Sequence, residues 1–175
     1  MSARVRVALA LAAALGVAAC GPTVDVSQGL QFTIVDIGWY DMGIVNGQNK
    51  LVPGVTFTVK NVSTQKLGSV QVNALFRRVT EKDEWGSGFV TAAGSAGLAP
   101  AAETPPLTVR SPLGYTGSDS RADMLHNSQF VDAKVELFAK YGSTQWKRIG
   151  EYPIQRTLIE KKEPANGSPA RLKRG

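Results

Sequence analysis

Alternation of apolar and polar residues over two neighbouring stretches is the feature that most constrains this chain. In "GVTFTVK" and again in "SVQVNALFR", every second residue is apolar and most residues between them are polar. The apolar set is Val55, Phe57 and Val59 in the first stretch, and Val70, Val72, Ala74 and Phe76 in the second. A period of two is that of a β-strand with one buried face. Since a one-residue slip would bury Lys60 and Arg77, the register is well specified.

Strand-like segments separated by turn signals continue on both sides of this region. Alternation begins at Leu30, and Asn46-Gly47 is a strong signal for a tight turn. The segment 131–159 predicts a strand, a turn and a final strand pair, whereas Ser118 or Ser120 could cap one helical turn. We therefore expect an all-β fold, an antiparallel two-sheet β-sandwich of about seven or eight strands with at most one short helix.

The stretch 55–77 also resembles a known group of domains. Two alternating strands joined through Asn61-Val62-Ser63 are similar to the central strands of bacterial Ig-like or fibronectin-like sandwich domains, including the short FxLYD-type modules. The resemblance covers 23 residues. It implies an Ig-like architecture for the domain and assigns no functional residue.

The first twenty residues have the layout of an export signal. Arg4 and Arg6 precede an uncharged run, residues 7–19, which is shorter than the ~20 apolar residues of a membrane-spanning helix. The run ends in Val17-Ala18-Ala19-Cys20, which resembles the lipobox of bacterial lipoproteins. An ordinary secretory signal and an uncleaved anchor are the alternatives.

The lipobox resemblance implies a specific fate for the only cysteine. Its sulfur would carry diacylglycerol, the leader would be cleaved before it, and the acylated Cys20 would hold the protein on the lipid bilayer. Gly21 occupies the next position. In enterobacterial lipoproteins an Asp at this position resembles a signal for retention in the inner membrane, so the Gly favours the outer membrane. We therefore expect a lipid-anchored protein of the cell envelope, in the outer membrane and facing the periplasm of a Gram-negative bacterium.

Composition divides the chain into four parts. We expect a cleaved signal peptide over 1–19, a lipidated tether over 20–29, a β-sandwich domain over 30–159 and a disordered basic tail over 160–175. The tail has a net charge of +3, so the part between the leader and the tail is close to neutral at +1. Because a nucleic-acid site needs basic residues clustered on a folded face, we expect no nucleic-acid partner.

Few residues suggest chemistry. The single histidine, His126, lies in a polar stretch and cannot build a His-rich metal site, so we expect neither a metal nor a cofactor. Aromatic residues are the remaining candidates for weak partner or ligand contacts, and they are Trp85, Trp39, Tyr40 and Trp146. Trp85, in the charged turn 81–86, is the best candidate for an exposed position. Core packing is the default interpretation of Trp39 and a reasonable one for Trp146.

Three functional hypotheses follow. The leading one is a non-catalytic binding or structural module, not an enzyme, that contacts another envelope protein. The second is a periplasmic small-ligand or glycan binder that uses Trp85 and the loop 91–106, part of the charge-poor segment 88–106, as a wall. The third and weakest is a hydrolase assembled from His126, a serine and an acidic residue that are distant in the sequence.

Overall fold

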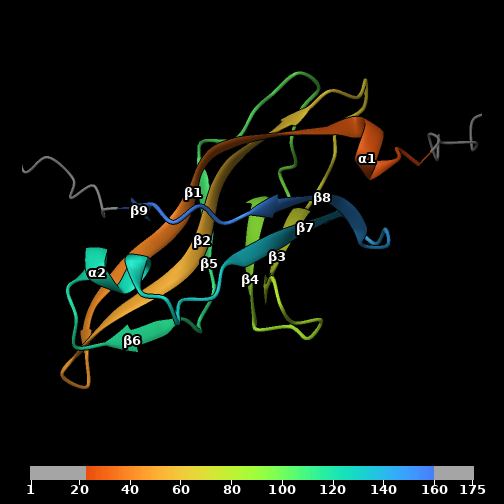
Figure 1. Cartoon of the computed structure of the whole chain (residues 1–175). Coiled ribbons are helices and arrows are strands. Elements are labelled where there is room, and N and C mark those ends of the chain that lie inside the picture. The colour runs from red at the N-terminus through yellow and green to blue at the C-terminus, as the bar shows by residue number, and fades with distance from the viewer. Residues whose placement is uncertain (1–22, 160–175) are drawn as a thin grey trace, which may run out of the picture.

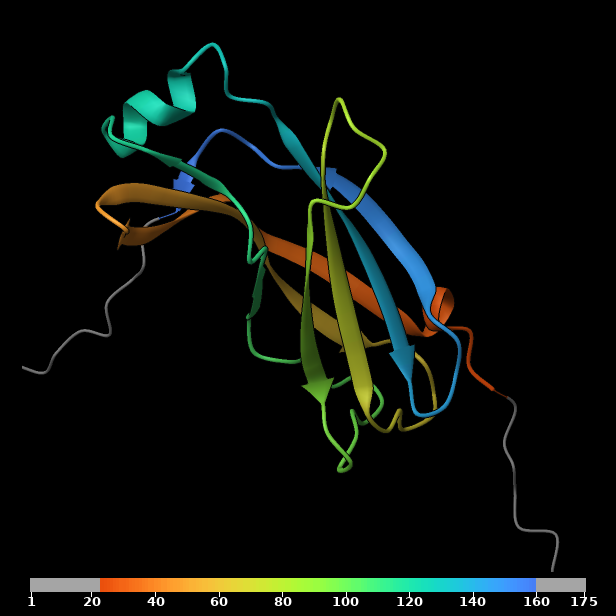
Figure 2. The ribbon, with the colours of Figure 1, turned by 90° about the horizontal axis from the view of Figure 1, so that it is seen from below.

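In the computed structural model, which describes residues 23–159, the chain forms two packed antiparallel sheets. The strands are β1 (Leu30–Val45), β2 (Gln48–Asn61), β3 (Val70–Arg78), β4 (Gly86–Ala93), β5 (Leu107–Arg110), β6 (Tyr115–Gly117), β7 (Ala133–Tyr141), β8 (Lys147–Pro153) and β9 (Leu158–Ile159). The helices are α1 (Val26–Gly29) and α2 (Arg121–His126). Figure 1 and Figure 2 show the two sheets from perpendicular directions. The all-β sandwich predicted from the sequence is confirmed.

The order of the strands is that of a sandwich whose connections cross between sheets. One sheet has the order β5-β2-β1-β9, with β6 also paired to β2, and the other has the order β4-β3-β7-β8. Thus the first, second and fifth strands face the third, seventh and eighth, as strands A, B and E face C, F and G in immunoglobulin-type sandwiches. All pairings are antiparallel except that of β1 with β9.

A long hairpin gives the molecule its axis. The strands β1 and β2 have 16 and 14 residues and are joined at Asn46-Gly47, whose φ angles of 52° and 78° are those of the predicted tight turn. At about 3.3 Å per residue, β1 spans roughly 50 Å. In both ribbon views, α1 lies at one end of this axis, and α2, β6 and the hairpin turn lie at the other.

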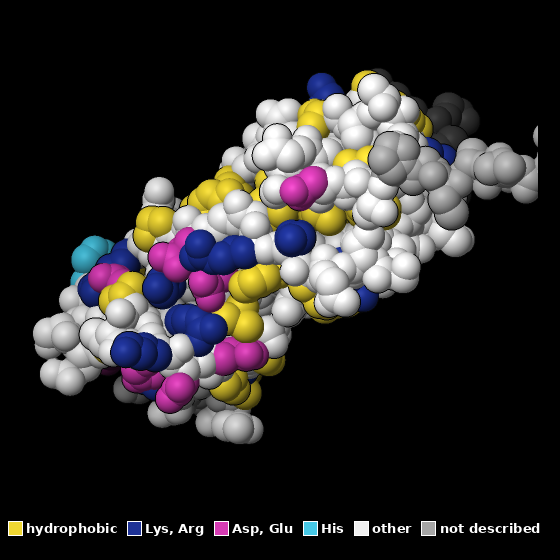
Figure 3. All heavy atoms as spheres, turned by 90° about the vertical axis from the view of Figure 1, so that its right-hand side faces the viewer, with side chains coloured by type: hydrophobic (Ala, Val, Ile, Leu, Met, Phe, Trp, Pro, Cys, Tyr) yellow, Lys and Arg dark blue, Asp and Glu magenta, His cyan; other side chains and the backbone are white. Residues whose placement is uncertain are grey.

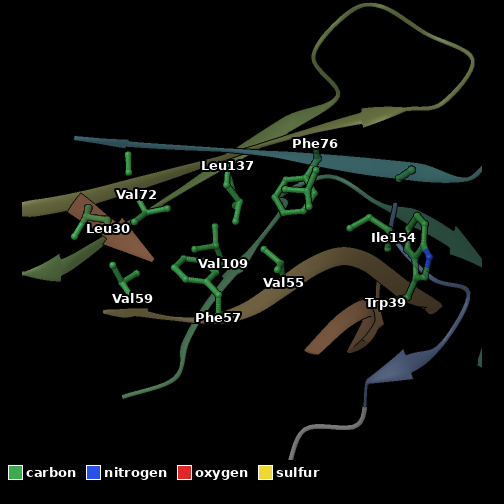
Figure 4. Close-up of a cluster of buried hydrophobic side chains, with 14 of the residues drawn as sticks. Leu30, Trp39, Val55, Phe57, Val59, Val72, Phe76, Val109, Leu137 and Ile154 are labelled. Atoms are coloured by element: carbon green, nitrogen blue, oxygen red, sulfur yellow. The ribbon is translucent and has the colours of Figure 1, made fainter. Parts of the chain in front are cut away.

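The core lies between the sheets and is built from the alternating residues. The seven apolar residues singled out in β2 and β3 are all 0% exposed. Figure 4 shows Val55 and Phe57 on one sheet pointing toward Phe76 and Leu137 on the other. Lys60 stays exposed and Arg77 half-exposed, as the predicted register requires. Burial of a large apolar side chain contributes about 1.5–3 kcal/mol, so this pattern fixes which face of each strand is internal.

Two expectations about the elements are corrected. The described residues contain nine strands and two helices, where seven or eight strands and at most one helix were expected. The extra strand β9 has only two residues and forms by docking beside β1, and the extra helix α1 has four residues capped by the Asp25 side chain. Elements this short have no periodicity that a sequence could display. The predicted Ser120 cap of α2 is confirmed, because its Oγ accepts a hydrogen bond from Asp123 N–H at 3.2 Å.

The domain also begins earlier than the expected boundary at residue 30. Val24 hydrogen-bonds through both its N–H and its carbonyl oxygen to the Tyr141 hydroxyl, at 2.8 and 3.1 Å, and Val26 is 2% exposed. The later part of the expected 20–29 tether is therefore part of the folded body. The expected signal peptide over 1–19, the expected lipidation site Cys20 and the expected tail over 160–175 lie outside the described residues.

Candidate functional site

The aromatic residues proposed as contacts belong to two different environments. Trp39 is 0% exposed and is surrounded by the rings of Phe130, Tyr115 and Trp85, with centroid separations of 4.6, 5.6 and 6.1 Å. Trp85 is only half-buried, but it packs on Tyr115 at 5.2 Å and lies beneath the Arg78 guanidinium. These rings form a largely internal cluster at the end of the sandwich nearer α2, so Trp85 is partly covered, where an exposed position was expected.

A backbone hydrogen bond explains why Trp85 turns inward. Although it follows four exposed residues, its N–H donates to the Phe76 carbonyl at 2.9 Å and continues the strand pairing at the start of β4. Charge in the preceding turn gave no information about this bond. Tyr40 is likewise covered: it is 8% exposed, its hydroxyl hydrogen-bonds Thr56 Oγ1 at 2.7 Å, and burial raises the pKa of its phenol.

Trp146 has a different position and is open to solvent. It immediately precedes β8, is 39% exposed, and its ring lies 6.3 Å from that of Phe89 in an edge-on contact. Phe89 on β4 is itself 57% exposed, and the Lys140 ammonium lies 5.0 Å from the centroid of the Trp146 ring. Since β4 and β8 are opposite edges of their sheet, this contact between the two rings crosses the outer face of the strands between them, β3 and β7.

Phe89 is a surface residue that sequence reasoning missed. Its neighbour Val90 packs against the core, whereas Phe89 points outward. In "GFVTAA" the two faces of the strand carry no difference in polarity, so no pattern indicated which residue was internal. An isolated apolar pair in a strand of small residues is the only signal, and it does not assign a face.

The same outer face carries a ladder of ion pairs. Glu136 accepts hydrogen bonds from Arg77 and Arg148, each at 3.1 Å, and Arg148 also pairs with Glu151 at 2.9 Å. Burial opposes ionisation of Glu136, but the two guanidinium groups outweigh it and hold the pKa of this carboxyl below its usual range. On the face shown in Figure 3, Lys/Arg and Asp/Glu side chains are accordingly intermixed. The positive and negative side chains on this surface therefore largely balance each other's charge.

The end of the molecule near α2 presents a second group of exposed apolar side chains. Three residues beside the hairpin turn, Met42, Ile44 and Val45, are 44%, 72% and 38% exposed. We call them the hairpin tip. Arg121 of α2 forms an ion pair with Asp41, which ties the helix to the base of this tip. A hollow of about 170 Å³ lies nearby between β6 and α2, too small for a drug-sized ligand.

The loop 91–106 does not form a wall with Trp85. After β4 it runs along the edge of β2, where Leu98 and Thr104 are buried and Asn61, which is 0% exposed, hydrogen-bonds the Leu98 carbonyl through its side chain. The Ala101 N–H donates in turn to the Asn61 carbonyl at 2.8 Å. Most of this segment therefore completes one edge of the sandwich, and the expected ligand wall is not formed.

The described residues offer no recognisable catalytic grouping around His126. It is exposed at the end of α2, and its Nδ1 hydrogen-bonds the carbonyl oxygen of Ala122 at 2.8 Å. Within residues 23–159, no three His, Cys, Asp or Glu side chains gather as metal ligands. In the same range, no helix has the length and apolar character needed to cross a membrane.

Comparisons with known proteins add little to this geometry. No protein-family model matches the chain, and no curated protein matches it. Among solved structures, it is similar to the X-ray structure of the Northeast Structural Genomics Consortium target SoR45, with a TM-score of 0.38 and 10% sequence identity. That similarity covers 75% of this chain and 86% of the other.

Proposed function

We propose that this protein is a lipid-anchored, non-catalytic binding module of the cell envelope. The leader and Cys20 support the anchor, which would place the protein in the outer membrane facing the periplasm. The observation that carries the proposal is the arrangement of the two ends. The folded chain begins at one end of the sandwich, and the exposed hairpin tip lies at the other.

In this arrangement the proposed membrane attachment and the exposed hairpin tip lie at opposite ends of the domain. The long strand β1 runs from the α1 end to the tip, and its 16 residues have a contour length of roughly 50 Å, which is the upper limit of the separation between the tip and the start of the strand. Within residues 23–159, Ile44 is 72% exposed and Met42, which contacts the Arg110 guanidinium, is 44% exposed, and burying each against a partner would contribute up to about 1.5–3 kcal/mol. An apolar projection at the far end of an anchored body suits a contact with another envelope protein.

Photo-crosslinking in native membranes tests the proposal. A photoreactive residue placed at Ile44 is expected to form a covalent adduct with one discrete partner, identified by mass spectrometry. The matched control places the same group at Gln31, which is exposed on the same strand at its other end. Ile44→Asp should reduce co-purification of that partner. Equal adducts at both positions, or none at Ile44, would refute the tip as the contact.

The glycan-binding alternative is favoured by one observation, the exposed Phe89–Trp146 pair. Aromatic rings with an apolar face and nearby polar groups are suitable stacking surfaces for sugars. Titration of tryptophan fluorescence with envelope glycans tests it, with Trp146→Phe as the variant that should abolish the response. A response that persists in this variant would contradict a site at Trp146.

A further inference from the structure

The fold holds the chain very close to the predicted lipid attachment point. Val24 is fixed by its two hydrogen bonds to Tyr141, and Val26 and Leu30 are buried behind it. Only residues 21–23 separate Val24 from Cys20 in the sequence. Even a fully extended chain spans no more than about 14 Å over four residues. The body therefore has a short reach from the sulfur that would carry the acyl chains.

This reach is comparable to the thickness of the membrane surface layer. Acyl chains on Cys20 would keep its sulfur at the level of the lipid headgroups, and the headgroup region of one leaflet is roughly 5–8 Å thick. Whatever surrounds Val24 must then lie at or just above that layer. The side chains at this end of the sandwich, which we call the anchor end, can be identified in the structure.

The anchor end consists of α1 and the β7–β8 turn. Residues 23–26 and the turn residues Ser143–Gln145, together with Lys147, line a shallow groove beside the start of the described chain. The same turn carries Trp146, partly exposed, with Lys140 against its ring. The one carboxylate in this groove, Asp25, already accepts hydrogen bonds from the Ser27 N–H and hydroxyl at 2.9 and 2.7 Å.

A partly exposed tryptophan with adjacent lysines is the side-chain combination found at membrane–water interfaces. The indole has an apolar body and a polar N–H that prefer the headgroup level, and lysine stems lie along apolar surface while the ammonium reaches phosphate groups. Nearby lysines also gain from anionic lipids, at about 1 kcal/mol each. Trp146, Lys140 and Lys147 supply these groups at the end of the body closest to Cys20.

We propose that the anchor end rests on the bilayer surface, with Trp146 inserted at the headgroup level and Lys140 and Lys147 on lipid phosphates. This inference rests on the proposed lipid anchor. It also gives the body a defined orientation, in which the hairpin tip points away from the membrane, whereas a long tether would leave the orientation free.

Fluorescence quenching by brominated lipids tests the proposal on the mature, full-length protein. The protein is reconstituted into vesicles of phosphatidylethanolamine and phosphatidylglycerol whose acyl chains are brominated near the headgroup. Trp39 is buried and Trp85 is half-buried, and both lie in the aromatic cluster toward α2, far from the anchor end, so only Trp146 should be quenched. We expect quenching in the parent protein, its loss in Trp146→Phe and its retention in Trp85→Phe, the matched control.

The outcomes separate this inference from the proposed function. Mass spectrometry of the same preparation first establishes whether Cys20 carries diacylglycerol. A lipidated protein without quenching, or with quenching unchanged in Trp146→Phe, would overturn the orientation and leave the anchor intact. A mature chain without the lipid mass would overturn the proposed anchor and this inference with it.

Discussion

Replacement of Asn61 is expected to cause a large loss of stability, because this buried side chain joins three segments. Its Nδ2 donates to the carbonyl oxygens of Gln65 and Leu98, both at 2.8 Å. Its Oδ1 accepts from the N–H and the hydroxyl of Ser63, at 3.0 and 2.7 Å. All four bonds disappear in Asn61→Ala. At about 0.5–1.5 kcal/mol net per bond, we expect a loss of about 3 kcal/mol in the free energy of unfolding.

The near-isosteric variant Asn61→Asp sharpens the prediction. It keeps the shape but directs an oxygen at two carbonyl oxygens, so at neutral pH it should cost at least as much as Asn61→Ala. Burial and these oxygens raise the folded-state pKa of the new carboxyl above its unfolded value of about 3.9. Below the unfolded pKa the new carboxyl is protonated in both states, so it destabilises the fold least there. As pH rises from the unfolded toward the folded pKa, the unfolded state ionises first and the folded state loses stability. The deficit of Asn61→Asp should therefore narrow in acid.

Equilibrium unfolding in urea, followed by tryptophan fluorescence, measures both variants. With a slope of about 2 kcal/mol per molar urea, a loss of 3 kcal/mol lowers the midpoint by about 1.5 M. Ser63→Ala is the control, because it keeps the Asn61 side chain and removes only the half-buried Ser63 hydroxyl, with its 2.7 Å bond to Asn61 and its 3.0 and 3.3 Å contacts with the Gln65 backbone; it should cost less than Asn61→Ala, about 1 kcal/mol. An Asn61→Ala midpoint within about 0.5 M of the parent would refute the linking role of this side chain.

Three further predictions concern the rest of the fold. Glu136→Gln should lower the free energy of unfolding by about 1 kcal/mol at neutral pH and by almost nothing in acid. The lowered pKa of the native carboxyl gives stability that is present above its unfolded pKa and is lost as pH falls through the folded pKa. Unfolding measured across pH checks how the stability of the parent protein changes over this range. Gly114→Ala should destabilise by about 2 kcal/mol or more in thermal unfolding, since a Cβ would collide with the Leu51 carbonyl, whereas Gly68→Ala, with no atom within 4 Å of the added carbon, should stay within about 0.5 kcal/mol. Gly47→Ala should cost about 1 kcal/mol, because its φ of +78° is strained for a residue with a Cβ; calorimetry showing an unchanged melting temperature would contradict this.

The sequence was most informative where one face of a strand is buried and the other is not. Alternation in 55–59 and 70–76 identified the internal face of β2 and β3 completely, because burial of valine and phenylalanine outweighs any local preference. The hairpin turn at Asn46-Gly47 was equally predictable, since both residues have positive φ and these residue types tolerate it best. Both signals act over a few residues and need no knowledge of the tertiary structure.

Surface placement was less predictable because it depends on contacts between distant segments. Trp85 follows a charged turn, yet a bond to Phe76 and packing on Tyr115 place it in the internal cluster. Phe89, which the Trp146 ring contacts edge-on, and Ile44 stay largely exposed among the described residues, and local patterning does not report this. The start of the folded body was missed for a similar reason, since Tyr141 is 117 positions away from Val24.

The first and last strands of the described chain lie side by side and parallel, which has a mechanical consequence. If the proposed lipid anchor holds the amino-terminal side, a pull on the carboxyl-terminal side acts along these strands and loads their pairing in shear. The pairing of β9 is short, from Leu158 to Ile159, and a bond from Trp39 N–H to the Thr157 carbonyl at 2.8 Å reinforces it. The β1–β9 pairing should break before the much longer β1–β2 pairing. A stretched molecule would therefore extend first at its carboxyl-terminal strand, and the β1–β2 hairpin would stay folded.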